Sequence, residues 1–368
     1  MGKCRLCKKE SILISQRLGF CVDCIRERFE EARDGLLALH SRLRERDGLP
    51  PRVPSAEGGK RCRICSNRCS IPEGGRGFCG VHENKGHRIR PVTGSPKKAY
   101  VQWYYDPLPT NCCASWVCPG GSDKGYPCFS YSKGPEYGYY NLAVFYCACN
   151  FDCLFCQNWS YRRCQKPPYV HETEELFEAA LSPRVSCVCF FGGDPTPQVV
   201  HALICARKMV RDSGKKILRI CWETNGAVSK PFLLKMAELS LKTGGCIKVD
   251  LKCFSEELSY ALCGVSNTEV KENFKFLSEY SKKRPDPPLL VASTLLVPGY
   301  VDEKEIERLS QFISSIDPEI PWVLLAFHPD FHLLDLPPTP KDYALRCLKV
   351  AKSFGLKEVR LGNVHLLC

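Results

Sequence analysis

The chain has 368 residues, of which 44% are hydrophobic and 25% charged, enough for one large globular domain with smaller modules. No apolar run reaches the ~18 residues of a membrane span, and the first residues show no apolar signal segment. We therefore expect a cytoplasmic protein without a membrane partner. The 26 cysteines, several in CxxC pairs, indicate metal sites in a reducing compartment rather than disulfides.

The formal charge of +12 is unevenly distributed along the chain. Residues 1–170 hold 27 Lys and Arg against 15 Asp and Glu, whereas residues 171–368 hold 25 of each. A basic half is typical of nucleic-acid binding. Each zinc ion held by four thiolates adds a net charge of −2, however, so two or three such sites would cancel about half of the excess. Nucleic-acid binding is thus an alternative that we do not favour.

Two CxxC pairs thirteen residues apart lie in residues 1–47, a spacing typical of a zinc ribbon. We expect structural zinc here, with a hairpin formed by residues 12–14 and 18–20 and a packing helix over 25–46. A cluster for electron transfer is the alternative. The four candidate zinc ligands are Cys4, Cys7, Cys21 and Cys24.

Residues 48–60 are rich in Gly and Pro and are expected to be a linker, followed by a cysteine-rich, metal-binding segment over 61–135. This segment contains two sets of four cysteines. The first set predicts a site for zinc or an auxiliary iron–sulfur cluster, and its members are Cys62, Cys65, Cys69 and Cys79. The second lies in an irregular stretch and forms either a third metal site or small apolar packing residues: Cys112, Cys113, Cys118 and Cys128.

The most informative motif is Cys149-x3-Cys153-x2-Cys156, on a loop that follows an apolar run. Three thiolates suit a [4Fe-4S] cube and leave one of its four irons free to bind a substrate or cofactor. A closed site would need a fourth ligand, for which Cys147 and Cys164 are near enough in sequence. An open cube also suggests an anaerobic or microaerobic host.

Residues 136–368 alternate short β-rich runs with amphipathic helical runs, which predicts an α/β fold with a parallel sheet. The expected strands are 140–147, 185–191, 217–222, 246–251, 289–296 and 321–327. The expected helices are 172–181, 197–212, 230–240, 268–280, 303–315 and 340–354, and a short run at 357–361 ends the chain. Six strands are too few for a closed eight-stranded barrel, so we expect an open (β/α)6 partial barrel.

Polar and glycine residues follow these strands at their carboxyl ends, where ligands bind in such sheets. Each could serve only as a turn or a helix cap. Five such sets after consecutive strands favour a common site: Gly192-Gly193-Asp194, Glu223-Thr224-Asn225, Asp250 with Lys252, Val297-Pro298-Gly299 and His328.

The three-cysteine motif, with Phe155 before its last cysteine, resembles the signature of the radical S-adenosylmethionine (SAM) superfamily. Residues 60–368 resemble the AmmeMemoRadiSam branch of that superfamily, which is itself similar to pyruvate formate-lyase activating enzyme. Further matching marks are Arg76-Gly-Phe-Cys-Gly-Val81, Asp106-Pro-Leu108, Cys118-Pro-Gly120, Val297-Pro-Gly-Tyr300 and Gly362-Asn-Val364.

Two departures from these relatives concern the site. The fifth strand contains Val291-Ala-Ser-Thr294, where activating enzymes have an arginine near SAM. The branch relatives have a histidine before the early Pro-Gly turn, whereas this chain has cysteines there and a cysteine-bearing insertion over 122–138.

The resemblance implies a fold and a chemistry. Cys149, Cys153 and Cys156 would hold the [4Fe-4S] cluster, and an external donor such as flavodoxin or ferredoxin would supply the electron that cleaves SAM to methionine and a 5′-deoxyadenosyl radical. That radical would abstract a hydrogen atom from a small-molecule or protein substrate. The implied positions are Phe155 at the adenine, Gly192, Gly193 and Asp194 at the methionine ammonium, Thr224 and Asn225 along the methionine or ribose, Glu223 and Asp250 at a monovalent cation near SAM, and Lys252 and His328 at the SAM or radical site.

Several functions remain open at this point. Modification of a small molecule or a side chain comes first, because relatives in the AmmeMemoRadiSam system are associated with two small partner proteins. The alternatives are a glycyl-radical-enzyme activase, an RNA-modifying radical SAM enzyme and a non-catalytic iron–sulfur or zinc protein for electron transfer or docking. The last would have little use for the glycine and polar residues at the strand ends.

Overall fold

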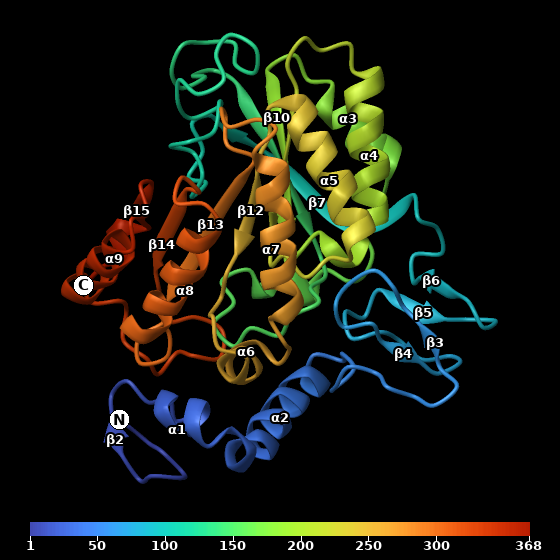
Figure 1. Cartoon of the computed structure of the whole chain (residues 1–368). Helices are drawn as coiled ribbons and strands as arrows, with labels where there is room; N and C mark the ends of the chain where they lie inside the picture. Colours follow the sequence, from blue (N-terminus) through green and yellow to red (C-terminus); the bar gives the residue numbers. More distant parts are fainter.

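A computed structural model describes all 368 residues and contains a nine-stranded, largely parallel sheet (Figure 1). Along the sheet the order is β15-β14-β13-β12-β11-β10-β8-β7-β9. Its seven parallel strands are β8 (Tyr140–Tyr146), β10 (Val185–Gly192), β11 (Arg219–Thr224), β12 (Ile247–Asp250), β13 (Leu290–Leu296), β14 (Trp322–Ala326) and β15 (Val359–Gly362). The two ends of the sheet do not pair, so the barrel is open.

Six helices connect the parallel strands and cover one face of the sheet (Figure 1). They are α3 (Thr173–Ala180), α4 (Val199–Asp212), α5 (Lys230–Thr243), α7 (Thr268–Ser281), α8 (Glu303–Ile316) and α9 (Lys341–Ser353). Most residues of the inner strands are buried, and every residue of β13 is buried, as expected for strands of a covered parallel sheet. The predicted α/β partial barrel is thus confirmed.

The strand count and the start of the sheet differ from the prediction. The short run at the end of the chain forms β15, a seventh parallel strand that pairs with β14. At the other edge, β7 (Lys98–Pro107) runs antiparallel to β8 and to the short β9 (Val170–Glu172). The sheet therefore begins before the boundary expected at residue 136. A half-exposed edge strand lacks the continuous apolar run that marked the inner strands.

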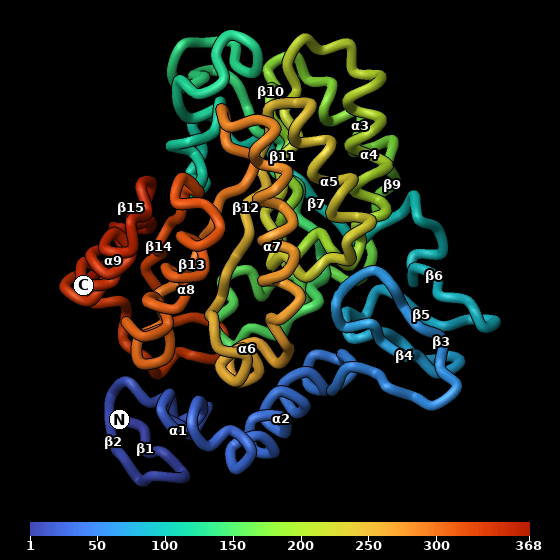
Figure 2. The backbone as a smooth tube through the Cα atoms, viewed as in Figure 1, coloured from blue at the N-terminus to red at the C-terminus, as the bar shows by residue number.

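The N-terminal module consists of β1 (Gly2–Lys3), β2 (Glu10–Ser11), α1 (Val22–Glu27) and α2 (Phe29–Arg46). Its paired strands are β1 and β2, so the hairpin predicted over residues 12–20 is wrong. The expected single helix is divided into α1 and α2 at Arg28. Figures 1 and 2 show this module beside the short helix α6 (Glu256–Cys263), which the sequence analysis missed.

Small two-stranded sheets connect this module to the barrel. One pairs β3 (Lys60–Arg61) with β4 (Ser70–Ile71), and the other pairs β5 (His82–Asn84) with β6 (Ile89–Pro91). Both lie in the segment expected to bind metal. None of the helices combines the length and apolarity that crossing a membrane requires.

The N-terminal module contacts the barrel through the turn after β13. The Tyr300 hydroxyl accepts a hydrogen bond from the Ser15 backbone N–H at 2.9 Å and donates one to the Phe20 carbonyl at 3.0 Å. Gly299, at φ +80°, packs against Leu13 so closely that a Cβ would collide with the Leu13 carbonyl. Arg26 completes the contact with two hydrogen bonds, 2.6 and 2.8 Å, to the Asp302 carboxylate.

Candidate active site at the carboxyl ends of the strands

One cavity of about 430 Å³ brings most of the predicted site residues together. It runs along the inner face of the sheet, between the three-cysteine loop and the segment around residues 104–120. The predicted residues in its lining are Cys149, Cys153, Phe155, Cys156, Gly192, Gly193, Asp194, Glu223, Thr224, Asn225, Asp250 and Lys252. Two of the five predicted sets lie outside the lining: Val297-Pro298-Gly299, and His328, which is exposed whereas Phe327 before it is buried.

The three-cysteine loop presents its sulfurs to the cavity. Cys149 Sγ accepts hydrogen bonds from the Phe151 backbone N–H at 3.4 Å and from Asn225 Nδ2 at 3.8 Å. Such donors stabilise a metal-bound thiolate and tune the potential of a cluster. Burial raises the pKa of Cys156 to about 12, so the free thiol keeps its proton at neutral pH and metal binding has to release it.

No nearby cysteine is positioned as a fourth ligand beside Cys149, Cys153 and Cys156. Cys147 and Cys164, the fourth ligands that the sequence offered, are joined to each other by a disulfide, which the sequence analysis did not expect. Cys263 interacts with Cys153 but is fully buried and does not line the cavity. Three thiols that face a cavity fit a [4Fe-4S] cube with one open iron.

The N-terminal module stabilises the three-cysteine loop through hydrogen bonds from α2. Asp152, between two of the cysteines, accepts hydrogen bonds from His40 Nδ1 at 2.6 Å and from Arg44 Nη1 at 3.3 Å, both on α2. Arg162 also binds this carboxylate. Burial alone would raise the pKa of Asp152, but the hydrogen bond from His40 and the two guanidinium groups lower it to about 2. The carboxylate is therefore charged and fully paired.

Asp194 joins two strand ends rather than pointing a free carboxylate into the cavity. It accepts hydrogen bonds from the backbone N–H groups of Thr196 at 2.8 Å and Asn225 at 2.6 Å. The Thr224 hydroxyl adds contacts at 3.1 and 3.2 Å. Its acceptor positions are thus occupied by protein donors, which leaves little capacity for the ammonium contact that the resemblance implied.

Gly192 is required by the close approach of β10 to β8. Its φ of +121° disfavours any residue with a side chain, and a Cβ would overlap the backbone of Tyr146. Its carbonyl accepts a hydrogen bond from Asn158 Nδ2 at 3.0 Å, which ties the residues after Cys156 to the strand end. The double glycine therefore has a packing role as well as any contact with a ligand.

The middle of the cavity contains a charge network centred on Lys248, which the sequence analysis missed. Lys248 Nζ lies 3.0 Å from Glu223 Oε2 and 3.6 Å from Asp250 Oδ1. Lys252 Nζ lies 2.7 Å from Asp250 Oδ2. Burial would lower the pKa of Lys248, but these carboxylates raise it above its usual range.

Lys248 lies between the two carboxylates at the predicted monovalent cation site, which stays a prediction. The two carboxylates expected to hold the cation, Glu223 and Asp250, are bridged by the Lys248 ammonium. The sequence did contain a signal for Lys248. It lies within the buried strand Ile247–Asp250, two positions from Asp250 and therefore on the same face of the strand.

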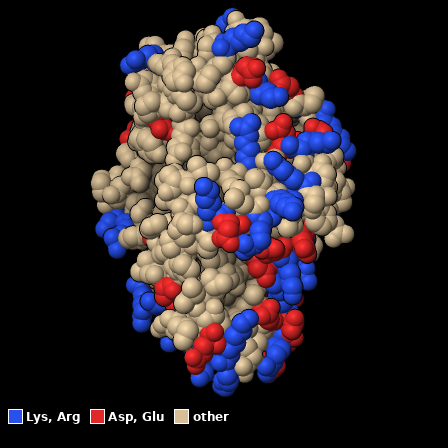
Figure 3. Space-filling model, turned by 90° about the vertical axis from the view of Figure 1, so that its left-hand side faces the viewer, with Lys and Arg blue, Asp and Glu red and all other residues tan.

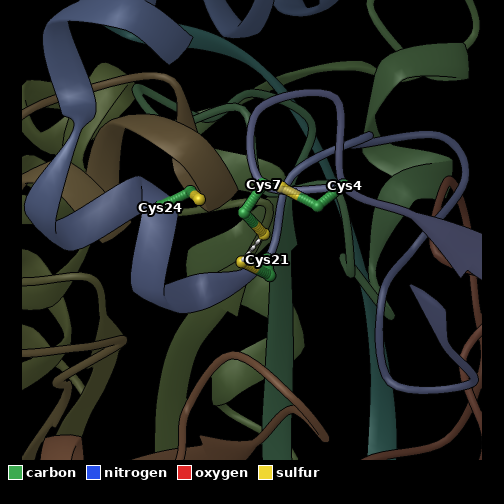
Figure 4. A group of neighbouring side chains, drawn as sticks. All are labelled: Cys4, Cys7, Cys21 and Cys24. Atoms are coloured by element: carbon green, nitrogen blue, oxygen red, sulfur yellow. Dashed lines mark hydrogen bonds between the residues drawn. The ribbon is translucent and has the colours of Figure 1, made fainter. Parts of the chain in front are cut away.

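The ribbon cysteines form the tightest thiol set of the molecule. The sulfurs of Cys4, Cys7, Cys21 and Cys24 all lie within 4.8 Å of one another. Cys7 and Cys21 face each other at 3.6 Å (Figure 4). Zn–S bonds of about 2.3 Å place tetrahedral ligands roughly 3.8 Å apart, so this set fits a single zinc ion.

The other two predicted sets are less compact. Cys62, Cys65, Cys69 and Cys79 are neighbours, but their sulfurs do not all meet within 4.8 Å. In the next set, Cys112, Cys113 and Cys118 line the cavity, whereas Cys128 is exposed and outside it. Cys112 Sγ donates to Glu223 Oε1 at 3.1 Å, which connects this set to the charge network.

Comparison with known proteins finds a similar family and similar relatives. Residues 143–313 match the family model of the Radical SAM superfamily. An "Uncharacterized protein" of Methanocaldococcus jannaschii is 26% identical over 328 residues, 83% of this chain and 81% of its own length. A "Putative glycyl-radical enzyme activating enzyme" of the same organism is 25% identical over 207 residues, 56% of this chain and 74% of its own.

Among solved structures, a domain of pyruvate-formate lyase-activating enzyme from Bacteroides vulgatus superimposes with a TM-score of 0.38 at 18% identity. The match covers 48% of this chain and 98% of that domain. The family match and the named relatives agree with the three-cysteine motif and the open parallel sheet. Residues 143–313 thus match the Radical SAM superfamily, and the chain is similar to proteins named as activating enzymes of glycyl-radical enzymes.

Proposed function

We propose that this enzyme binds SAM beside Cys149, Cys153 and Cys156 and abstracts a hydrogen atom from a small substrate held in the charged middle of the cavity. The supporting observation is that a single cavity contains both the three thiols and the network around Lys248. The cluster and SAM supply the radical chemistry when bound, because protein side chains do not generate such radicals unaided. The role of the chain is then to orient the reactants and exclude water.

The sheet provides the orienting groups. Phe155 is buried at the cavity wall and offers an apolar surface for the adenine. Gly192 and Gly193 allow a ligand to approach the backbone at the end of β10. Lys252, close to both Asp250 and the Phe155 ring, places a positive charge beside the three-cysteine loop, where it can pair with a SAM carboxylate.

Polar groups line the part of the cavity around Lys248. Asn141 on β8 lines the cavity, and its Oδ1 atom has no hydrogen-bond partner in the protein. A buried acceptor of this kind normally has a partner, so a substrate N–H or O–H donor is the natural one. A volume of about 430 Å³ is in the usual range for one ligand, and SAM takes much of it. We therefore propose a small, polar substrate with a hydrogen-bond donor.

Activation of a glycyl-radical enzyme is the second candidate. It is favoured by two relatives, the one described above and the "Isethionate sulfite-lyase activating enzyme" of Desulfovibrio desulfuricans, which is 29% identical over 139 residues. In this case a glycine loop of a partner protein would enter the cavity in place of the small molecule.

Nucleic-acid modification finds less support. On the face in Figure 3, Lys and Arg side chains gather along one side, but Asp and Glu side chains lie among them. Exposed cations of this protein also pair with carboxylates, for example Arg346 with Glu303 and Asp342. A continuous basic surface, which binding to phosphates favours, is therefore not formed on this face.

The test separates these candidates by the size of the substrate. The protein is reconstituted anaerobically with iron and sulfide, reduced in the presence of SAM, and mixed with either the low-molecular-weight or the protein fraction of a host-cell extract. We expect formation of 5′-deoxyadenosine, stimulated by the low-molecular-weight fraction. Stimulation by the protein fraction alone, with a glycyl-radical signal in electron paramagnetic resonance (EPR), would establish the activase instead. No 5′-deoxyadenosine despite an intact cluster would overturn the proposal.

A further inference from the structure

The cavity contains one carboxylate that no protein group neutralises. Four carboxylates line the cavity, and three of them have partners within the protein: Asp194, Glu223 and Asp250. The fourth is Asp106, near the end of β7, which forms no ion pair and accepts no side-chain hydrogen bond from the protein. A partly buried carboxylate without a partner favours a ligand that brings a positive charge.

Strand pairing places Asp106 beside an amide whose oxygen also lacks a partner. Asp106 on β7 lies directly opposite Asn141 on β8 in the antiparallel register. Side chains that lie directly opposite share one face of the sheet, with their Cβ atoms about 5 Å apart. Asn141 is 7% exposed and lines the cavity, and its Oδ1 atom has no hydrogen-bond partner. Two acceptors, one of them charged, are therefore neighbours without a donor from the protein.

The sheet directs Asp106 to the cavity. Tyr104 and Asp106 both line the cavity, whereas Tyr105 between them donates a hydrogen bond to the Ala179 carbonyl on α3 at 3.0 Å. Successive side chains of a strand point to opposite faces, so Tyr105 faces the helices and Asp106 faces inwards. The position of the carboxylate is thus fixed by strand pairing and not by a loop.

The wall around these two acceptors is uncharged. Cys187 pairs with Asn141 in the parallel register of β10 and β8, and Cys189 pairs with Ala143. All of these residues line the cavity, and a thiol packs as a small apolar group. Burial raises the pKa of Cys189 above its ordinary value, so this thiol is neutral at neutral pH. Opposite charges attract each other more strongly in such surroundings than in water.

The charge balance of the cavity also favours a cation. Against its four carboxylates, the lining contains two ammonium groups, Lys248 and Lys252, and no arginine or histidine. Burial and repulsion from Glu223 raise the pKa of Asp106. A positive group beside Asp106 would offset this repulsion, because opposite charges stabilise the ionised carboxylate.

An ammonium group fits this place better than a metal ion. Calcium and magnesium need several oxygen ligands around one point. Glu223, the nearby carboxylate, is instead held by Lys248 at 3.0 Å and by the Cys112 thiol at 3.1 Å. An ammonium group has three donors, which suits two separate acceptors such as Asp106 and Asn141, whereas the planar guanidinium group is suited to bidentate contact with one carboxylate.

We infer that the substrate carries a positively charged amino group, which binds between Asp106 and Asn141. The inference rests on the proposed function and names the class of its substrate. Asn141 is five residues before the end of β8 at Tyr146, so at about 3.3 Å per residue the amino group would bind roughly 16 Å from that strand end. The three-cysteine loop follows this end. The amino group would thus anchor one end of the substrate, and the rest would extend towards the proposed SAM site.

The first test uses the charge of the substrate. The low-molecular-weight fraction of a host-cell extract is divided on a cation-exchange resin at pH 7, and each part is added to the reconstituted, reduced enzyme with SAM. The retained part should stimulate 5′-deoxyadenosine formation. Acetic anhydride, which converts amines to uncharged amides, should abolish this stimulation. Stimulation by the unretained part alone, or stimulation that survives acetylation, would overturn the inference and leave the proposed function intact.

Substitutions of Asp106 test the place of binding. Asp106→Asn removes the charge and keeps the size, so the concentration of the retained part that gives half-maximal stimulation should rise about ten-fold or more. Asp106→Glu keeps the charge and should recover part of the affinity. The matched control, Asp123→Asn, is at an exposed position outside the lining and should behave as the wild type. Equal half-maximal concentrations for Asp106→Asn and Asp123→Asn would overturn the inference.

A binding measurement makes the inference independent of SAM cleavage. The probes are n-butylammonium chloride, which carries the proposed charge, and n-butanol in sodium chloride of matched ionic strength. Butylammonium should raise the thermal unfolding temperature of the reconstituted wild type more than butanol does, and this difference should disappear in Asp106→Asn. An equal response of the wild type to both probes would overturn the inference. Absence of 5′-deoxyadenosine despite an intact cluster would instead overturn the proposed function.

Discussion

The ribbon and the three-cysteine loop both present cysteine thiols, but the ribbon forms a compact set of four, whereas the loop forms an open set of three. In the ribbon, four sulfurs lie within 4.8 Å of one another, which is enough to complete a tetrahedral site. In the loop, three sulfurs face a cavity and do not close to that distance. The comparison teaches that the number of thiols and the space in front of them separate a structural site from a chemical one.

The two regions are nevertheless connected. The helix α2, which follows the ribbon, contributes His40 and Arg44 to the carboxylate of Asp152 within the three-cysteine loop. The closed site thus stabilises a module whose helix supports the open one. Four substitutions test how separate the two regions are, beginning with the largest expected effect.

The first substitution removes one sulfur from the open set. In Cys153→Ala the cluster loses a ligand, so reductive cleavage of SAM should fall by at least about a thousand-fold, because no side chain replaces the cofactor. The measurement is 5′-deoxyadenosine formed under anaerobic reduction. Cys205→Ala is the control and should retain activity, and a Cys153→Ala protein as active as this control would contradict the open-cluster assignment.

The second change removes a sulfur from the closed set. Cys21→Ser should release zinc and unfold residues 1–47, since apparent zinc-binding energies of about 10 kcal/mol or more stabilise such modules. Zinc content and the protease sensitivity of this module report the effect. The iron content of the barrel should persist. If iron is lost to the same extent as in Cys153→Ala, the two regions are not separable.

The third substitution breaks the connection between them. Arg44→Met removes a buried partner of Asp152, which should lower the free energy of unfolding by about 3–5 kcal/mol. Thermal unfolding of the reconstituted protein and the EPR spectrum of the cluster are the readouts. Arg42→Met, at an exposed position of α2, is the control and should change little. Equal stability of the two variants would show that the Asp152 contact is dispensable.

The smallest effect concerns the contact between the ribbon and the turn after β13. Gly299→Ala places a Cβ against the Leu13 carbonyl at a positive φ, and should cost about 2–3 kcal/mol. Gly355→Ala has a similar φ of +82° but open space around it, so it should cost only about 1 kcal/mol. The difference in melting temperature between the two variants measures the effect of the clash with Leu13. Equal melting temperatures would mean that the N-terminal module shifts to accommodate the Cβ without loss of stability.

The parts of the fold that the sequence predicts best are those with a strong local period. The buried strands and the amphipathic helices of the barrel were expected nearly to their ends, for example α4 and β13. The edge strand β7 was missed because only alternate residues near its start, such as Ala99 and Val101, are buried. The short helix α6 is too brief to show a helical period.

For the site, the sequence predicts which residues follow the strands but not where their side chains point. Asp194 has the expected position, yet its carboxylate bonds to Thr196, Thr224 and Asn225. The proximity of Cys187 and Cys221, whose sulfurs are 3.7 Å apart, was not expected, because residues that neighbouring strands bring together are tens of positions apart in sequence. Lys248 was overlooked partly for the same reason, since its partner Glu223 is on a different strand, although Asp250 is only two positions away.

The contact between Ser15 and Tyr300 has a consequence for how the chain is made. The two residues are 285 positions apart, and Asp335, which also binds Ser15, is 320 positions away. Chains are synthesised from the N-terminus, so the ribbon leaves the ribosome long before the surface that will receive it. During that interval a zinc ion, if the four ribbon thiols bind one as their spacing predicts, would have to keep residues 1–47 folded without the barrel. A shortage of zinc in the growing cell would then damage newly made chains while sparing those already assembled.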